Sequence, residues 1–449
     1  MTAAQPAEVE ADVLAVAADG AFVRELDARL AGADALTLAY VDRGRIVAVP
    51  VETNDAEGLR TAAARAVRAA GGGTVAWALE DAQDIRAVVE GAVLGGYDAG
   101  RWKSEPAPSV ERFVVCNAPE ELRAVAARAE VVARWTNVAR ELVDAPPNVI
   151  TPAGLAERAT ALPGLAVEVL DPAEAGLPAL AAVGGSSTQA PRLIVLRHGS
   201  AEAPQLALVG KSVTFDAGGY FLKPQSDIVR QKADMAGGAA VLAALGAIAE
   251  LDLPLSVLGV LPACENMLGP EPIRPTDVIR TAAGLTVEVT NPDAEGRLIL
   301  ADALWYARAR GATRVVDLAT LTGAIRAGMG DLYGGVFAND DAWRDAVVDA
   351  GNAAGDLAWP WPLHPRYRRM LDSTVADVRN SSGKGFGYPI FAATFLERFA
   401  GEGPWAHVDM LGPALLDDDR GDAIGRGASG YGVRMLIELA TRLAGPPLP

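Results

Sequence analysis

The chain has 449 residues, half of them apolar and 22% charged, as in a soluble globular protein that is long enough for two domains. Its net charge of −17 argues against a nucleic-acid partner, because a phosphate backbone is bound by positive surfaces. The start of the chain lacks the basic segment of a signal peptide, the apolar run 236–249 is short for a membrane span, and two cysteines make no disulfide framework. We therefore predict a cytoplasmic protein with no membrane partner.

The first part of the chain predicts a small α/β domain over residues 1–117. Apolar spacing predicts strands at 35–40, 45–51, 75–79 and 113–116, and helices at 56–70 and 84–94. No cluster of His, Cys or acids occurs there, so we predict a structural or assembly role for this domain. Residues 118–144 predict a connecting helix, which begins with Pro119 and two acids and ends at the proline-rich run APPNVITP.

Residues 145–449 alternate strand and helix patterns, which is typical of a sheet that helices cover on both faces. Strands are expected at 192–197, 206–209, 255–261, 286–289, 314–318 and 407–410, and helices at 237–251, 297–310, 342–353, 390–400 and 432–443. We therefore predict an α/β protein of two domains, whose larger C-terminal domain is catalytic and has a central mixed β-sheet flanked by helices.

Several familiar catalytic motifs are incomplete. The run GKS at 210–212 resembles the end of a phosphate-binding loop, but position 205, where that motif needs glycine, is Gln. No Gly-x-Ser-x-Gly elbow of a serine hydrolase is present. The three histidines are scattered singly, which predicts structural or surface roles rather than a zinc site; they are His198, His364 and His407, the last of which is expected near the site.

Two stretches instead gather lysines and acids. Only five of the 40 cationic residues are lysines, and three of them lie in one stretch, 206–235, at Lys211, Lys223 and Lys232. The acids and one arginine of the two stretches are Asp216, Asp234, Asp293, Glu295 and Arg297. We expect the four acids at or just after C-terminal strand ends, where open α/β sheets form their sites. Four converging carboxylates need cations, and their oxygens suit a pair of divalent ions about 3.5–4 Å apart.

The segments around these residues resemble a known family. GKSVTFDAGGYFLKP, KADMAGGAA, CENM and NPDAEGRL are similar to signature segments of the leucyl aminopeptidases, the two-metal cytosol aminopeptidases. ARELVDAPPNVITP, VVDLATLTGA and WAHVDMLGPA resemble further segments, so the likeness covers about residues 130–449 in order. It implies that residues 145–449 form a two-metal peptidase domain.

The resemblance also implies roles for individual residues. Asp216 and Glu295 bridge two metal ions, Asp293 completes one site, and Lys211 and Asp234 complete the other. The ions are expected to be Mn²⁺ or Zn²⁺, with Mg²⁺ possible, and they share a bridging hydroxide. Lys223 stabilises the carbonyl oxygen, and Arg297 holds a bicarbonate ion that acts as general base. The implied enzyme hydrolyses the first peptide bond of peptides with a free N-terminus and assembles as a homohexamer of two stacked trimers.

Some positions depart from the family pattern and leave other readings open. Pro292 stands where the family usually has Thr, and Gln231 stands where it commonly has Met in the first side-chain pocket. Thr320 and Gly323 match pocket positions, whereas Tyr388 and Phe391 replace a glycine-rich run at the pocket rim. One alternative is a catalytically silent assembly or regulatory homologue, and another is a different two-metal hydrolase, such as a phosphatase.

Overall fold

The structure is a computed structural model that describes residues 13–17, 37–41, 44–53, 55–80, 83–105, 107–200 and 205–445. The chain forms two compact units. The first contains residues 1–137 and 417–427, and the second contains residues 138–416 and 428–449. The division falls within α4 (Arg123–Asp144), which follows the 3₁₀ turn η3 (Glu120–Leu122) in the region where a connecting helix is expected.

The first unit has a five-stranded sheet with the order β2-β3-β1-β4-β5. Its strands are β1 (Val13–Ala17), β2 (Thr37–Val41), β3 (Gly44–Val49), β4 (Gly73–Ala78) and β5 (Val110–Cys116), and its helices include α2 (Ala56–Ala70) and α3 (Ile85–Gly95). Helix α2 begins where the Asp55 side chain accepts from Gly58 N, and it ends at Gly71 with φ of 69°. These caps explain why the predicted helix 56–70 is confirmed to the residue.

The second unit is built on a mixed sheet with the order β15-β14-β17-β13-β8-β10-β7-β6, and β9 extends it by pairing with β10. The strands are β6 (Ala166–Leu170), β7 (Arg192–His198), β8 (Leu206–Gly210), β9 (Ser212–Asp216), β10 (Val257–Asn266), β13 (Arg314–Ala319), β14 (Gly334–Ala338), β15 (Ala358–Pro360) and β17 (Trp405–Asp409). Strands β10, β8, β13 and β17 are parallel, whereas β7 and β14 run antiparallel to their neighbours β10 and β17. The predicted central mixed sheet is confirmed.

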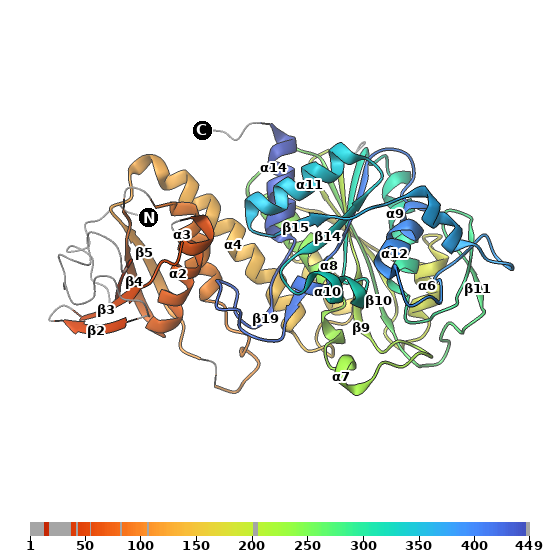
Figure 1. Cartoon of the computed structure of the whole chain (residues 1–449), viewed down its shortest axis with the longest axis horizontal. Helices are drawn as coiled ribbons and strands as arrows, with labels where there is room; N and C mark the ends of the chain where they lie inside the picture. The colour runs from red at the N-terminus through yellow and green to blue at the C-terminus, as the bar shows by residue number, and fades with distance from the viewer. Residues whose placement is uncertain are drawn as a thin grey trace. The chain divides into compact units, whose positions relative to one another are not determined.

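Helices cover both faces of this sheet (Figure 1). One face carries α8 (Ala236–Glu250), α11 (Asp341–Ala354) and α14 (Val433–Ala444), and the other carries α6 (Pro178–Gly184), α9 (Gly296–Ala309) and α12 (Tyr388–Glu397). Residues 231–250 together have the length and apolarity of a membrane span, but 89% of the apolar 18-residue stretch within them is buried inside the protein. It therefore serves here as a core helix.

Close packing of α8 fixes the position of the strand end beside it. A Cβ atom on Gly237 would lie 2.1 Å from Leu318 O, and one on Gly210 would lie 2.5 Å from the Cα of Gly238. Gly238 N also donates to Lys211 O at 2.8 Å. The small residues of this helix are therefore required for the backbone approach that places Lys211 beside the helix.

Further helices, turns and short strands complete the fold. They are α5 (Pro152–Thr160), α7 (Gln225–Ile228), η4 (Gln231–Ala233), α10 (Gly323–Met329), η5 (Pro365–Leu371), α13 (Leu411–Ala414), β11 (Val278–Arg280), β12 (Thr286–Glu288), β16 (Val378–Arg379), β18 (Leu415–Leu416) and β19 (Gly427–Ala428). The predicted strand 286–289 corresponds to β12, which lies in a separate three-stranded sheet with β11 and β16. The sequence predicted a strand here but not the strands with which it pairs.

A buried carboxylate on α9 predicts a pH-dependent stability. Asp302 accepts hydrogen bonds from the backbone N–H groups of Ala179, Leu180 and Ala282 at 2.8, 3.1 and 2.8 Å. Burial nevertheless raises the pKa of Asp302 from 3.8 to about 6. Because the folded protein binds the Asp302 proton more tightly than the unfolded chain does, the raised pKa stabilises the fold. This contribution is complete below pH 3.8 and is lost as the pH rises through 6. The total is about 3 kcal/mol, of which about 1.4 kcal/mol falls between pH 5 and pH 8.

Urea unfolding of the wild type and of Asp302→Ala at several pH values measures this contribution. We expect the free energy of unfolding of the wild type to fall by about 1.4 kcal/mol more than that of the variant between pH 5 and pH 8. Other titrating groups are common to both proteins and cancel in the difference. Parallel pH profiles would contradict the raised pKa of Asp302.

Candidate metal centre

Asp216 ends β9, and the turn that follows it requires glycine. Gly218 has a φ of 89° and Gly219 a φ of 58°, both in the left-handed region. A Cβ atom on Gly218 would also lie 2.4 Å from Phe221 O. Gly218 N donates to Asp216 Oδ1 at 2.9 Å, so the tight turn fixes one carboxylate oxygen and leaves the other facing the site. Asp216 is buried there, with an exposed fraction of 2%.

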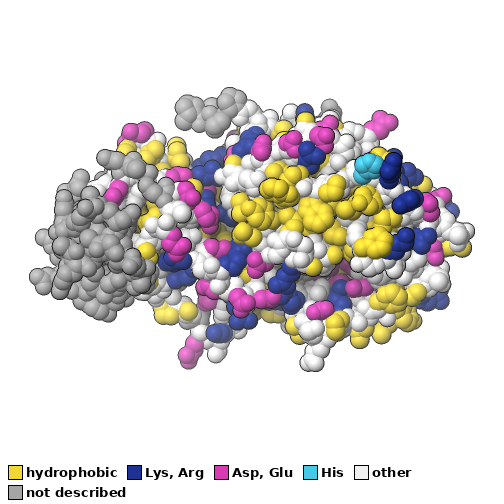
Figure 2. Space-filling view, viewed as in Figure 1, with side chains coloured by type: hydrophobic (Ala, Val, Ile, Leu, Met, Phe, Trp, Pro, Cys, Tyr) yellow, Lys and Arg dark blue, Asp and Glu magenta, His cyan; other side chains and the backbone are white. Residues whose placement is uncertain are grey.

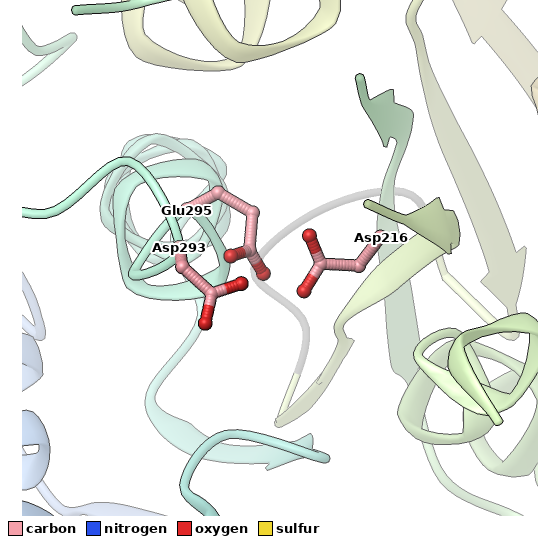
Figure 3. A group of neighbouring side chains, drawn as sticks. All are labelled: Asp216, Asp293 and Glu295. Atoms are coloured by element: carbon pink, nitrogen blue, oxygen red, sulfur yellow. The ribbon is translucent and has the colours of Figure 1, made fainter. Parts of the chain in front are cut away.

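Asp293 and Glu295 come from the loop that leads into α9. Asn291 Oδ1 accepts from Asp293 N at 2.9 Å, which holds the loop in a turn, and Glu295 immediately precedes the first residue of α9. Oxygens of Asp216, Asp293 and Glu295 lie within 4.8 Å of one another. Figure 3 shows the three carboxylates pointing toward one another from the strand end and the helix start. Such a cluster of oxygens is a suitable set of ligands for divalent cations.

Two lysines complete the cluster. Lys211 Nζ lies 2.8 Å from both Asp234 Oδ2 and Glu295 Oε1. Lys223 Nζ lies 2.8 Å from Asp216 Oδ2 and also contacts Asp293 Oδ1. The five predicted ligands, Lys211, Asp216, Asp234, Asp293 and Glu295, and the predicted catalytic Lys223 are therefore together in one site.

The origin of these acids differs from the expected one. Of the four, only Asp216 ends a strand of the central sheet. Asp234 follows the 3₁₀ turn η4 and precedes α8, and Asp293 and Glu295 follow the separate sheet that contains β12. The expectation that all four lie at or just after strand ends was wrong for Asp234, which follows a 3₁₀ turn, and the strand before Asp293 and Glu295 lies outside the central sheet.

The electrostatics of the site follow from burial of several like charges. Burial raises the pKa of Asp293 to about 7, and repulsion from Asp216 and Glu295 adds to the effect. Burial alone would lower the pKa of Lys211, but attraction to Asp234, Glu295 and Asp216 outweighs it and raises the pKa. The same opposition raises the pKa of Lys223. The carboxylates therefore attract positive charge strongly, as a metal centre requires.

A cavity of about 510 Å³ opens onto this centre. The residues predicted for the substrate pocket, Gln231, Thr320 and Gly323, all line it. Thr320 donates to Asp234 Oδ1 at 2.8 Å, and its backbone oxygen accepts from Lys211 Nζ at 3.1 Å. A Cβ atom on Gly323 would meet no atom within 4 Å, which leaves room for a ligand beside it. Their role in choosing a substrate stays a prediction.

Arg297 lies beside the cavity but does not line it. It is buried in α9 with an exposed fraction of 1%, and its Nη1 donates to Asn380 O at 2.8 Å. The guanidinium carbon lies 4.9 Å from the ring centroid of Tyr388 and 5.5 Å from that of Phe391. Arg297 Nε has no hydrogen-bond partner among the described residues. The site therefore holds a buried cation with an unused donor.

His407 lies in β17, where the sequence places a strand. Its Nδ1 lies 2.6 Å from Asp317 Oδ1, and Trp405 Nε1 donates to Asp317 Oδ2 at 2.7 Å. Burial alone would lower the pKa of His407, but Asp317 outweighs this effect and raises it. The pairing is consistent with the structural role expected from the sequence.

Two buried amides that sequence reasoning missed connect the ligand segments. Asn266 Nδ2 donates to Asp216 Oδ1 at 2.8 Å and to Pro292 O at 3.1 Å, so it links the strand end to the loop of Asp293. Asn380 Oδ1 accepts from Thr290 N at 2.8 Å. Only the quoted motif CENM pointed to Asn266, and no sequence signal pointed to Asn380.

Asn380 has the larger set of contacts with the ligand loop. Its Oδ1 accepts from Asn291 N at 3.1 Å, and its Nδ2 donates to Asn291 O at 2.7 Å and to Ala294 O at 3.4 Å. Its backbone oxygen accepts from Arg297, as described above. One fully buried side chain therefore holds both sides of the turn that carries Asp293.

We expect Asn380→Ala to weaken metal binding by about 10–100-fold, the usual effect of removing a hydrogen-bond partner that orients metal-ligating residues. Equilibrium dialysis against Mn²⁺ measures this change. Asn339→Ala is the matched control, because Asn339 holds Gly403 O and Trp405 N by the same kind of amide contacts. Wild-type affinity in Asn380→Ala would show that the loop keeps its shape without this side chain.

Comparison with known proteins agrees with the geometry. The profile of the cytosol aminopeptidase family, catalytic domain, matches residues 137–437. A probable cytosol aminopeptidase of Roseiflexus castenholzii is 45% identical over 367 residues, which are 78% of this chain and 75% of that protein. One from Streptomyces avermitilis is 42% identical over 406 residues, 86% of this chain and 79% of that protein.

Two solved structures share the fold across nearly the whole chain. The bottromycin maturation enzyme BotP in complex with Mn has a TM-score of 0.88 and 38% identity, and covers 96% of this chain and 99% of its own. A mutant of tomato leucine aminopeptidase has a TM-score of 0.87 and 31% identity, and covers 98% of this chain and 95% of its own. The fold and the carboxylate-lysine centre define a metal-dependent exopeptidase. The chain belongs to the cytosol aminopeptidase family.

Proposed function

We propose that the chain hydrolyses the first peptide bond of peptides with two divalent ions held by Lys211, Asp216, Asp234, Asp293 and Glu295. The observation that carries this proposal is the convergence of carboxylates from three chain segments around the buried Lys211 and the half-buried Lys223. When bound, such a pair of ions acidifies a water molecule into a nucleophile near neutral pH and polarises the scissile carbonyl. Mn²⁺ or Zn²⁺ fits the donor set, and Mg²⁺ is a further candidate.

The two lysines have different proposed roles. Lys211 offers its amine nitrogen as a ligand, and a nearby dication favours the neutral amine that this requires. Lys223 is less buried, lines the cavity and stays charged. It donates a hydrogen bond to the carbonyl oxygen as negative charge develops there. A donor of this kind stabilises a transition state by about 2.7–4 kcal/mol.

Arg297 is the residue that would hold a bicarbonate ion, which would supply a general base between the attacking water and the leaving amine. Two observations support a small anion there. Arg297 is buried without an acidic partner among the described residues, and its Nε donor is unused. A buried guanidinium favours an anion that supplies the missing charge and the missing acceptor.

The substrate class follows from the cavity wall and the proposed chemistry. A free α-amine is needed if that amine binds at the metal centre, which restricts cleavage to the first residue. We propose a broad preference for neutral side chains, because Gln231 gives the pocket a polar wall where a purely apolar one would favour Leu. Pro292 lies in the turn that carries Asp293, which Ala294 N closes by donating to Asn291 O at 3.1 Å, and the backbone oxygen of Pro292 accepts from Asn266.

Aminoacyl anilides and short peptides with free or acetylated N-termini test the proposal. The metal-loaded enzyme should cleave only the free forms, because acetylation removes the amine lone pair. Equal cleavage of both forms would contradict the amine-dependent mechanism. Binding of no metal and cleavage of neither form would favour a silent assembly protein, and cleavage of phosphate esters would favour a phosphatase.

Three further proposals concern the whole chain. Residues 145–449 form the peptidase domain, 118–144 the connecting helix, and 1–117 a structural or assembly domain.

The enzyme works in the cytoplasm as a homohexamer. Figure 2 shows apolar side chains gathered on one face of the second unit, and exposed Leu332 and Trp359 are apolar residues that a partner copy would cover. The mass in solution tests the hexamer, and retention on DNA at physiological salt would contradict the absence of a nucleic-acid partner.

A further inference from the structure

Tyr388 stands between Arg297 and the peptide cavity. Tyr388 lines the cavity and Arg297 does not, yet the Tyr388 ring centroid lies only 4.9 Å from the guanidinium carbon. Phe391 is three residues further along α12 and therefore on the same helical face, and its ring lies 5.5 Å from that carbon. Both distances are within the roughly 6 Å of a cation–π contact. The aromatic face of α12 thus covers the cation.

The buried cation behind this cover is incompletely satisfied. Arg297 has an exposed fraction of 1%, and its Nη1 donates a hydrogen bond to a neutral acceptor, Asn380 O. Its Nε has no partner, and no carboxylate pairs with it in the part of the chain that the structure describes. Aromatic faces offset a positive charge only partly, and they accept no in-plane hydrogen bond from Nε. The unused donor of Arg297 is therefore suited to a small anion that reaches it from the cavity.

Few contacts hold the ring of Tyr388 in place. Tyr388 is the first residue of α12, so its N–H lies among those that the helix leaves without internal partners. Gly387 precedes it with a φ of 66°, and a Cβ atom there would meet nothing within 4 Å. Residues 383–386 before it are exposed. The Tyr388 hydroxyl accepts from Asn291 Nδ2 at 3.5 Å, the limit of a hydrogen bond, so stacking is the main contact holding the ring.

We propose that Tyr388 gates the anion site of Arg297. With the ring stacked, Arg297 is closed off from the cavity. When the ring turns away, a small anion enters and binds Nε. The identification of that anion as bicarbonate rests on the proposed function, but the gate itself does not. Tyr388 is thus an access residue, because it controls when the proposed base is present.

Arginine labelling by phenylglyoxal tests the gate without any need for activity. The rate of modification of Arg297 is followed by mass spectrometry in the wild type, Tyr388→Ala and Tyr388→Phe. Removal of the ring should speed labelling by about tenfold or more, because it removes the closed state. Tyr388→Phe keeps the ring and should label like the wild type. Equal rates in all three proteins would overturn the gate.

Two reference arginines make this result specific. Arg366 is exposed and normalises the reagent concentration. Arg434 is buried and paired with Asp356 at 2.8 Å, so it reports any general loosening of the fold. A selective increase at Arg297 supports the gate. A parallel increase at Arg434 would overturn it, because Arg297 would then become reachable through unfolding.

Protection by bicarbonate extends the test to the anion. Bicarbonate should slow the labelling of Arg297, with an apparent dissociation constant about tenfold lower in Tyr388→Ala than in the wild type. Absence of peptidase activity together with this labelling pattern would reject the proposed function and keep the gate. Full peptidase activity with identical labelling in all variants would reject the gate and keep the proposed function.

Discussion

Replacing Glu295 by glutamine should reduce aminopeptidase activity by at least about 10³-fold, more than the 10–100-fold that follows loss of a partner of a metal ligand. Glutamine has the same shape but lacks the negative charge. Glu295 is buried with an exposed fraction of 2%, lies 2.8 Å from Lys211 Nζ, and shares the 4.8 Å cluster with Asp216 and Asp293. Its charge is thus central to the attraction of cations, and we expect bound Mn²⁺ to fall from two ions per chain toward one.

Steady-state kinetics on an aminoacyl anilide and metal analysis after dialysis measure both effects. Asp227→Asn is the matched control, because Asp227 lines the same cavity but its carboxylate accepts from Ser226 and is not part of the cluster. The control should keep both ions and activity within a few-fold of the wild type. Full activity in Glu295→Gln would mean that the cluster is not the catalytic centre.

Replacing Lys223 by methionine should lower kcat by about 10²–10³-fold with little change in KM, because the ammonium acts on charge that develops only in the transition state. Methionine keeps most of the length and apolar surface of the side chain. Lys223→Arg should not restore the activity, since a planar guanidinium does not reproduce a compact donor held between Asp216 and Asp293.

Metal content separates this role from that of a ligand. Lys223→Met should still bind two ions per chain. A variant that lacks a metal ligand should bind fewer than two. A variant with normal kcat and a raised KM would assign Lys223 to substrate binding instead. A variant without metal would assign it to the metal centre.

The parts of the fold that the sequence predicted well carry strong local signals. Helix 56–70 is bounded by the Asp55 cap and by Gly71, and the helix expected at 297–310 appears as α9, Gly296–Ala309. Strand β8 is a run of buried apolar residues, and β13 is mostly apolar apart from Arg314 and Asp317. Strand β9 and glycine-rich β14 were missed, because each has polar residues or glycines where an apolar run is expected.

The site was predictable in its residue types but not in its geometry. Unusual lysines beside acids in glycine-rich turns indicate a metal site, because few side chains bind cations. The three-dimensional convergence of Asp216 with Glu295 depends on sheet order, which no local pattern encodes. The contacts of Asn380 and the stacking of Tyr388 on Arg297 join segments about ninety residues apart, and therefore appear only in the folded chain.

Crystals of the Mn²⁺-loaded protein, measured at the manganese absorption edge, test the account most directly. The anomalous map should contain two peaks about 3.5–4 Å apart, between the carboxylates of Asp216, Asp293 and Glu295 and beside Lys211. A map without peaks at these carboxylates, from protein that cleaves peptides, would contradict the assignment of the metal centre.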